Sequence, residues 1–411
     1  MRDLAMEYSN YNFVGTLQIP ELLPEPKVSK NDKGVETFDY GAYTIKKGVS
    51  KQGKMYMSTA LRLSIVTDSG DTEYLDLNDY TQEGSVKVAY FRAKGSKDST
   101  QIDIALATDP KTIEQCESFM ITTVEIGDMK HETLSQSTLL QWMIQNRNAI
   151  VGKRVHVNGT IKVSEYNGKA QVKYPIKSIR NPYTTEVDGL NLDLKCIYGK
   201  NSVKAPTFEE ISKQDVKKVP VELMLPILID KNSKLIKFVP TDELVCLNVD
   251  ILNFENTQEN QNIYNTLCSL LNVRQVLNGT TLQDVPLEDF KYYGARFVGK
   301  IKSNRTEGEL KEEELTLQEK MYLQLKAKTL DDIKRERGIK KTTNKFISID
   351  AIPYDVDEIS GITEANFTGQ APETVSATDV FAQPQVSTPV SPTPTVGMPM
   401  GMPNFSMGLN K

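Results

Sequence analysis

Residues 155–180 read VHVNGTIKVSEYNGKAQVKYPIKSIR, and this stretch predicts a β-hairpin. Apolar and polar residues alternate over 155–163 and again over 170–176, which places one set of side chains on a buried face. Between the two runs stands Asn167-Gly168, the dipeptide best suited to a type I′ turn, because both central residues need a positive φ. Pro175 cannot donate a backbone hydrogen bond, so we expect an edge or a bulge there.

The predicted hairpin carries more positive charge than its fold requires. From Lys153 to Arg180 there are seven Lys or Arg residues against one acid, Glu165. One explanation is a solvated sheet face on which lysines prevent pairing with other strand edges. The other is a surface that neutralises phosphates, and the rest of the chain bears on this choice.

The overall charge does not decide between them. The chain of 411 residues has a net charge of −5. Residues 355–411 hold six acids and one base, so this segment alone accounts for −5 and residues 1–354 are neutral overall. Any binding surface must therefore be a local patch.

Composition predicts a globular protein of two or three domains, with 39% hydrophobic and 25% charged residues. The apolar runs are too short to span a bilayer, and the first ten residues have no apolar signal core. The four cysteines, at 116, 196, 246 and 268, show no zinc or disulfide spacing. We therefore expect a cytoplasmic protein, in the host cell if phage-encoded, with no membrane contact.

The predicted fold class is mainly β (α+β). Strands at 12–20, 55–77, 85–93 and 101–107, a helix near 135–149 and the final hairpin are compatible with an OB-like antiparallel barrel with insertions in residues 1–185. Residues 186–354 predict a second α+β domain, with a charged helix that ends before Gly338. In residues 355–411, rich in Pro, Met and Gly, we expect a disordered acidic tail.

The hairpin resembles the last strands of bacterial and phage single-stranded DNA-binding proteins. Their pattern G-K-x-V-x-V-x-G-x-(L/I)…Y…G-K…Y-x-(I/V) is matched here by Gly152, Lys153, Val155, Val157, Gly159, Ile161, Tyr166, Gly168, Lys169, Tyr174 and Ile176. The resemblance implies an OB fold and single-stranded DNA as ligand, and covers about 28 residues of the chain. The chain departs from that family in its large insertions, its second domain and a C-terminal end, NFSMGLNK, without terminal acids.

The second region is open to two interpretations. It is either an unrelated α+β domain or a diverged barrel that arose by duplication. The segment YGARFVGKI in 293–301 echoes YNFVGTLQI in 11–19, and one short echo does not decide between them.

Catalytic motifs are missing from the sequence. The two histidines, His131 and His156, fall in different predicted elements without metal-ligand spacing, and no phosphate-binding loop or nucleophile elbow occurs. We therefore expect no enzyme, no cofactor and no metal.

Three segments interleave basic and aromatic residues, the combination that holds single strands through stacking and phosphate contacts. We expect the first segment in the loop after the first strand and the hairpin tip at the opposite side of one binding face. The candidate nucleic-acid-binding residues are Tyr43, Lys46, Lys47, Lys51, Lys54 and Tyr56, then Arg92, Lys94 and Lys97, then Arg154, Lys162, Tyr166, Lys169 and Lys173. Tyr174 shares the apolar alternation and is predicted to be a core residue.

The sequence thus favours a sequence-tolerant single-stranded DNA-binding protein of phage-type replication or recombination. In this hypothesis, replication or recombination proteins are partners through the tail. Two alternatives stay open: a structural or assembly protein, such as a virion component, and an accessory protein that binds DNA but chiefly recruits partners.

Overall fold

The computed structural model describes residues 8–230, 235–306, 315–325, 328–337 and 342–369. These residues are mostly β-strand with a smaller helical part, as the mainly β prediction requires. The strands form several sheets, none of which closes into a barrel. No helix among the described residues is long and apolar enough to cross a membrane.

The largest sheet has 15 strands and runs through both halves of the chain. Its strand order along the main path, with bounds, is β12 (Met129–Thr133), β11 (Thr122–Ile126), β16 (Ser178–Arg180), β13 (Arg154–Thr160), β1 (Asn10–Gln18), β17 (Gly189–Tyr198), β24 (Tyr293–Thr306), β25 (Thr342–Ile349), β21 (Leu244–Leu247) and β18 (Val219–Pro220). Side branches are β6 (Leu63–Val66), β7 (Thr72–Leu75), β19 (Met224–Asp230), β20 (Leu235–Pro240) and β26 (Tyr354–Glu358). The described residues group as one compact unit, and the division near residue 185 stays a prediction.

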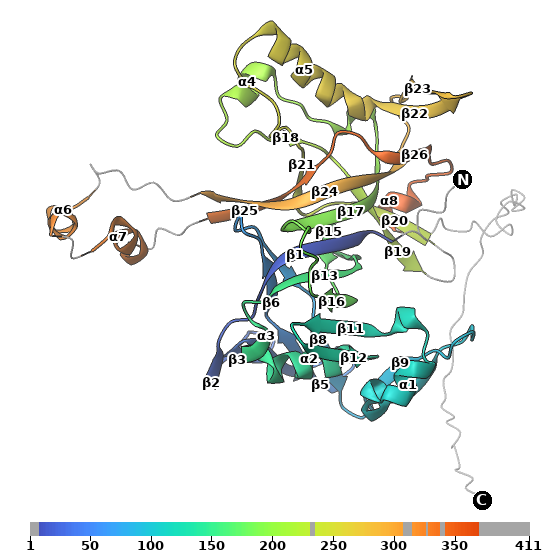
Figure 1. Ribbon diagram of the computed structural model, residues 1–411, viewed down its shortest axis with the longest axis vertical. Coiled ribbons are helices and arrows are strands. Elements are labelled where there is room, and N and C mark those ends of the chain that lie inside the picture. Colours follow the sequence, from blue (N-terminus) through green and yellow to red (C-terminus); the bar gives the residue numbers. More distant parts are fainter. Residues whose placement is uncertain (1–7, 231–234, 307–314, 326–327, 338–341, 370–411) are drawn as a thin grey trace, which may run out of the picture. The chain divides into compact units, whose positions relative to one another are not determined.

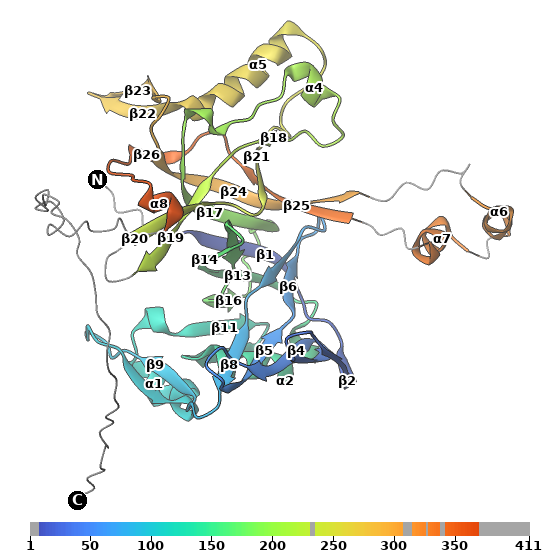
Figure 2. The same ribbon diagram turned by 180° about the vertical axis from the view of Figure 1, so that it is seen from behind.

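Strand β1 lies at the centre of this sheet, with β13 on one side and β17 on the other (Figure 1; Figure 2). Its inward side chains Tyr11 and Phe13 are fully buried. Tyr174 packs edge-on against both rings, with centroid distances of 5.3 and 5.0 Å, and its burial confirms the core prediction. The Tyr11 hydroxyl donates a hydrogen bond of 2.9 Å to the carbonyl of Pro175. These contacts attach the hairpin to the first strand.

The predicted hairpin is present and is interrupted once. Strands β13 and β16 pair antiparallel at its base, and β14 (Lys162–Tyr166) pairs with β15 (Lys169–Lys173) at its tip. Asn167 and Gly168 both have positive φ, 51° and 76°, as a type I′ turn needs. The second strand breaks off around Pro175, which forms a parallel bridge to Asp76. The proline thus marks a break between β15 and β16, where the sequence predicted an edge or a bulge.

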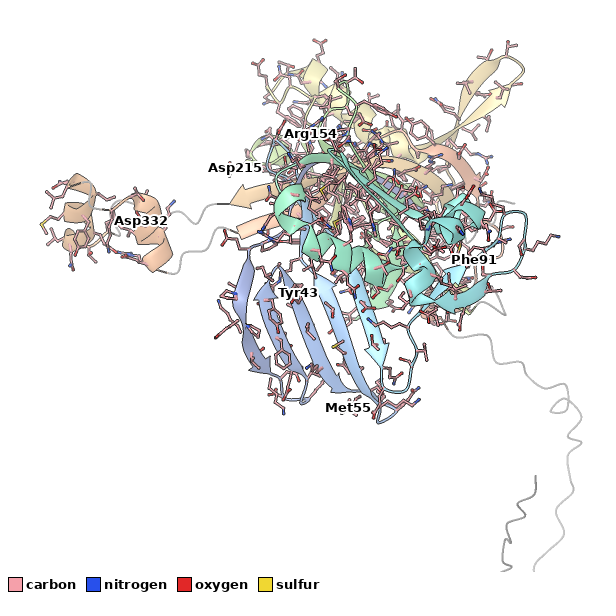
Figure 3. All side chains as sticks on the ribbon, turned by 60° about the horizontal axis from the view of Figure 1, so that its bottom comes forward. Tyr43, Met55, Phe91, Arg154, Asp215 and Asp332 are labelled. Carbon is pink, nitrogen blue, oxygen red and sulfur yellow. The ribbon has the colours of Figure 1, made fainter. Side chains whose placement is uncertain are left out.

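The first basic-aromatic segment is not a loop, as the sequence had predicted, but part of a separate five-stranded sheet. This sheet has the order β2 (Leu22–Lys30), β3 (Glu36–Gly41), β4 (Tyr43–Val49), β5 (Met55–Leu61) and β8 (Asn78–Gln82). Figure 3 shows its strands side by side, with Tyr43 and Met55 labelled. Strands β2 to β5 are inserted between β1 and β6, and β8 follows β7 in the chain. The predicted strands at 85–93 and 101–107 correspond to a small hairpin of β9 (Val88–Phe91) and β10 (Thr100–Asp103). The strand prediction is wrong for 104–107, which belong to a 3₁₀ helix, Ile104–Thr108.

The helix near 135–149 is confirmed as α2 (Gln136–Gln145) and α3 (Arg147–Ile150), and the second region has α5 (Gln258–Ser269) followed by a hairpin of β22 (Val273–Asn278) and β23 (Thr281–Pro286). The prediction of a single charged helix before Gly338 is wrong. It is two helices, α6 (Leu317–Gln324) and α7 (Leu330–Glu336). The Thr329 hydroxyl accepts a hydrogen bond from the amide of Asp332, so Thr329 caps a new helix there. Gly338 lies outside the described residues.

The prediction of a disordered tail from residue 355 is wrong for its first part. Strand β26 pairs with β24, and α8 (Ala365–Thr368) lies against β20. The Asn366 side chain donates a 2.8 Å hydrogen bond to the carbonyl of Ile236. A short strand needs only a partner edge to become ordered, which composition does not reveal. Residues 370–411 lie outside the described residues.

We predict that Gly159→Ala destabilises the chain by about 1–3 kcal/mol, because the added methyl group would overpack the contact of β13 with its neighbours. A Cβ at Gly159 would lie 2.3 Å from the Pro175 carbonyl oxygen and 2.8 Å from the Tyr11 ring. Gly189→Ala is the matched control, since its Cβ would meet only the flexible Asn191 side chain, at 3.3 Å. Chemical denaturation of both variants tests this. Equal stability of the two variants would contradict the close packing of Gly159 against Pro175 and Tyr11.

Candidate nucleic-acid interface

A cleft of about 750 Å³ lies beside the base of the predicted hairpin and takes residues from both halves of the chain. Four lysines and two aromatic residues line it: Lys162, Lys173, Lys177, Lys195, Tyr8 and Phe119. Pro226, Ile227 and Leu228 of the second half add an apolar wall, and Asp76 is the acid among the lining residues. Such a surface combines positive charge with rings on which bases can stack.

Phe119 presents an exposed aromatic ring at the cleft. Its side chain is 55% exposed, and the guanidinium of Arg92 lies 5.3 Å from its ring centroid. The Lys177 ammonium donates hydrogen bonds to the carbonyls of Ser118, Phe119 and Ile121, at 3.3 Å and 2.7 Å for the first two. Burial lowers the pKa of Lys177. Lys177 thus holds the backbone that presents Phe119 and is a positioning residue.

Two of the sequence-predicted residues, Lys162 and Lys173, line this cleft directly. They are opposite each other in the β14–β15 pair, and both side chains are exposed. Within the described residues neither lysine forms an ion pair. Arg92 joins them indirectly through its contact with Phe119, and its Nε donates a 2.7 Å hydrogen bond to the carbonyl of Ser96.

The residues of the first basic-aromatic segment do not converge on this cleft, contrary to expectation. They lie on β4, β5 and the turn between them, in the five-stranded sheet. Strand alternation places Tyr43 and Lys47 on one face and Lys46 and Tyr56 on the other. Tyr43 stacks on Tyr40 at 4.8 Å, Tyr56 stacks on Tyr80 at 5.7 Å, and the Lys47 ammonium lies 4.9 Å from the Phe38 ring centroid. Lys51 and Lys54 are exposed in the turn.

Several other candidates have partners that the sequence did not predict. Arg154 pairs with Asp188 at 2.7 Å. Lys169, at the hairpin tip, lies 3.5 Å from Asp242 of the second half. Lys94 and Lys97 are exposed in the connection between β9 and β10, and Tyr166 is 62% exposed. Arg154 and Lys169 therefore already have acidic partners within the chain.

Sequence reasoning did not place Tyr8, Phe119, Lys177 or Lys195 among the binding residues. Phe119 stands in the segment CESFMI, which holds no basic residue, so the search for interleaved charge passed over it. Lys195 had a detectable signal. It alternates with Leu190, Leu192 and Leu194 on β17, a pattern that puts it on the face opposite the core.

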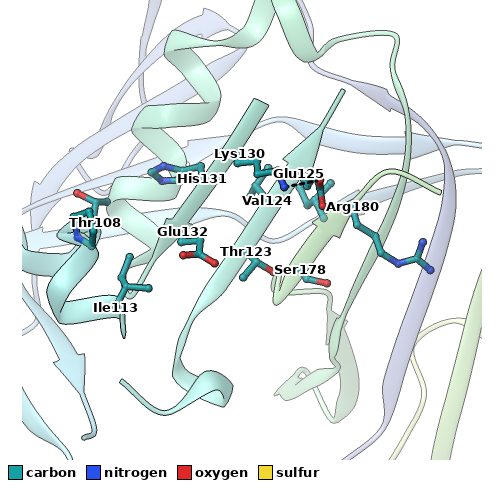
Figure 4. Close-up of a pocket in the computed structure, with 12 residues that line it drawn as sticks. Thr108, Ile113, Thr123, Val124, Glu125, Lys130, His131, Glu132, Ser178 and Arg180 are labelled. Atoms are coloured by element: carbon teal, nitrogen blue, oxygen red, sulfur yellow. Dashed lines mark ion pairs between the residues drawn. The ribbon is translucent and has the colours of Figure 1, made fainter. Parts of the chain in front are cut away.

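A second cleft, of about 760 Å³, lies over β11, β12 and β16 (Figure 4). It contains the ion pair of Glu125 and Lys130 at 3.2 Å. His131 stacks on Trp142 with ring centroids 5.1 Å apart, and burial lowers its pKa, so the imidazole is neutral at pH 7. Among the described residues, no three His, Cys, Asp or Glu side chains group to hold a metal ion.

No protein-family model matches the chain, and no curated protein matches its sequence.

We predict that Tyr166→Ala costs well under ~1 kcal/mol of stability, because the exposed ring contributes little to the core. Tyr174→Ala is the internal contrast. Tyr174 is 3% exposed and packs on Tyr11 and Phe13, so its truncation is expected to cost about 3–5 kcal/mol. Thermal melts of the two variants test the assignment. A large loss of stability in Tyr166→Ala would show that the tip ring is structural.

Proposed function

We propose that the chain is a non-catalytic protein that binds single-stranded DNA with little sequence preference through the cleft between β14–β15 and β19–β20. The observation that carries this proposal is the gathering of Lys162, Lys173, Lys195 and the exposed Phe119 around one cleft. Phosphate contacts and stacking carry little base information, so such a site tolerates any sequence. We further propose that the C-terminal acidic segment contacts replication or recombination proteins.

Strand connections in residues 10–180 support the finer proposal that this half follows an OB-type plan. β1 pairs antiparallel with β13 along most of its length and with β6 at its C-terminal end. Helices α2 and α3 directly precede β13, and β13 pairs with β16 as the final two strands of the main sheet in this half. In this plan the hairpin between those two strands flanks the ligand face, and the cleft adjoins that hairpin.

A second candidate function, a structural or assembly role, is favoured by a different surface. One face of the five-stranded sheet carries Val28, Val49, Met55 and Met57, which are 62%, 60%, 51% and 37% exposed. Val49, Met55 and Met57 are neighbours across β4 and β5, and exposed apolar side chains that group in this way are typical of protein-binding surfaces. An assembly protein of this kind would bind nucleic acid weakly, or with no dependence on salt.

Binding of a fluorescent oligonucleotide at several salt concentrations separates the two functions. We expect the single strand to bind more tightly than the duplex, and its affinity to fall by about 0.7 log units per log unit of salt for each phosphate neutralised. Phe119→Ala should weaken binding by about 1–3 kcal/mol through loss of a stacking ring.

Phe290→Ala is the control, because Phe290 is fully exposed in the second half and lies outside the cleft lining. It should bind like the wild type. Equal affinity for single strand and duplex, or equal loss in both variants, would contradict the proposed cleft.

A further inference from the structure

The two halves of the main sheet have the same strand arrangement when each is followed outward from the central β1–β17 pair. From the middle outward, the first half runs β1, β13, β16, β11, and the second half runs β17, β24, β25, β21. The pairing senses agree at every step: β1–β13 and β17–β24 are antiparallel, β13–β16 and β24–β25 are antiparallel, and β11–β16 and β21–β25 are parallel. Helix α2 precedes β13, as α5 precedes β24 with the β22–β23 hairpin between.

The residue registers agree as well. Strand β13 and its continuation read VHVNGTIK over 155–162, and β24 reads ARFVGKIK over 295–302, with Gly159 and Gly299 at the same place. Gly159 is opposite Tyr11 on β1, and Gly299 is opposite Leu192 on β17. Tyr11 and Leu192 are therefore equivalent residues, and they are also direct partners in the β1–β17 pair. If a twofold axis relates the two halves and passes between β1 and β17, some residue of β1 must lie opposite its own equivalent on β17, as Tyr11 lies opposite Leu192.

Polar contacts repeat the equivalence. His156 Nε2 lies 3.3 Å from the Asn12 side-chain oxygen, and at the corresponding positions Arg296 donates to Asp193 at 2.5 Å. The short echo between 11–19 and 293–301 aligns strands that are not equivalent, since the counterpart of β24 is β13.

The final hairpin of each half also contacts the β-hairpin that pairs with the first strand of the other half. Hairpin β14–β15 reaches β19–β20 through Glu165–Lys237 at 2.7 Å and Lys169–Asp242 at 3.5 Å. In return, β24–β25 reaches β6–β7 through Lys345–Glu73 at 2.8 Å. The amide of Ser303 adds a 2.6 Å hydrogen bond to Asp71. Reciprocal contact of this kind defines an isologous dimer.

We infer that residues 10–180 and 189–351 are two diverged copies of one unit, joined as an isologous pair within one chain, and that only one of the two equivalent clefts, the one beside β14–β15, keeps its strand-binding residues. The second clause rests on the proposed function.

The counterpart of the cleft has lost its aromatic residues and its accessible lysines. The paired registers place Gly189 at the position of Tyr8 and Leu244 at the position of Phe119. Lys302 corresponds to Lys162 but forms an ion pair with Asp250. Lys345 lies within one residue of the position of Lys173 and pairs with Glu73, whose side chain is 6% exposed. Lys302 and Lys345 thus stabilise the fold through ion pairs.

Engineered disulfides in the full chain test the axis without any reference to binding. Asn10–Asp193 and Asn12–Asn191 are cross-strand pairs that the axis interchanges. We expect the double variants Asn10→Cys/Asp193→Cys and Asn12→Cys/Asn191→Cys both to form a disulfide on oxidation. The diagonal pair Asn10→Cys/Asn191→Cys is the control and should stay reduced, because its Cα atoms lie too far apart. The native cysteines are buried. Failure of either direct pair, or efficient closure of the diagonal pair, would overturn the β1–β17 register and with it the twofold relation of the two copies.

Matched double substitutions test which of the two equivalent clefts binds the single strand. Lys162→Gln/Lys173→Gln should reduce the salt slope of oligonucleotide binding by about 1.4 log units per log unit and leave the melting temperature unchanged. Lys302→Gln/Lys345→Gln should leave the slope unchanged and lower the melting temperature, because Glu73 loses its counter-charge. Equal loss of slope in both variants would show two working clefts and overturn the second clause. A wild type that binds no single strand refutes the proposed function, while the disulfide result still decides the twofold relation of the two copies.

Discussion

The antiparallel pairing of β1 with β17 is the constraint on which the rest of the structure depends. Five residue pairs, from Asn10–Asp193 to Val14–Gly189, join the two halves edge to edge. An unpaired β1 or β17 would expose a row of backbone donors and acceptors, the usual template for aggregation. Here each strand satisfies the edge of the other, and one continuous sheet results.

The same pairing builds the candidate site. Lys195 stands on β17, while Lys162 and Phe119 belong to the first half, and all three line one cleft. The apolar wall of Pro226, Ile227 and Leu228 comes from β19, which branches from β17. The cleft therefore exists only when the two halves are paired. The β1–β17 pairing therefore both stabilises the sheet and shapes the proposed binding surface.

Local sequence signals predicted those parts of the fold that local physics determines. Alternation and the Asn167-Gly168 turn located the hairpin, and the apolar stripe of residues 139–144 located α2. The inserted five-stranded sheet escaped prediction because most residues of β2 to β5 are half-buried or exposed, so clean alternation is weak there. The break between α6 and α7 follows from the Thr329 cap, which competes with the helical propensity around it.

The sequence shows where basic residues cluster, but it does not show which of them form ion pairs within the chain and which can contact a ligand. Arg154 and Lys169 look like Lys162 in a charge pattern, yet they meet Asp188 and Asp242, acids that only the tertiary fold brings near. Phe119 shows the converse, because nothing around it in sequence indicates a binding role. Charge composition identifies a region, and ion pairing within the fold decides which charges remain accessible to a ligand.

Hydrogen–deuterium exchange of the full chain, with and without a saturating single-stranded oligonucleotide, tests the central claim most directly. The account predicts slower exchange on binding at 119–122, 160–164 and 173–177, which border the cleft, and unchanged exchange at the equivalent positions 300–303 and 345–349. Protection confined to the five-stranded sheet at 22–61, or bound oligonucleotide with no change around the cleft, would contradict it.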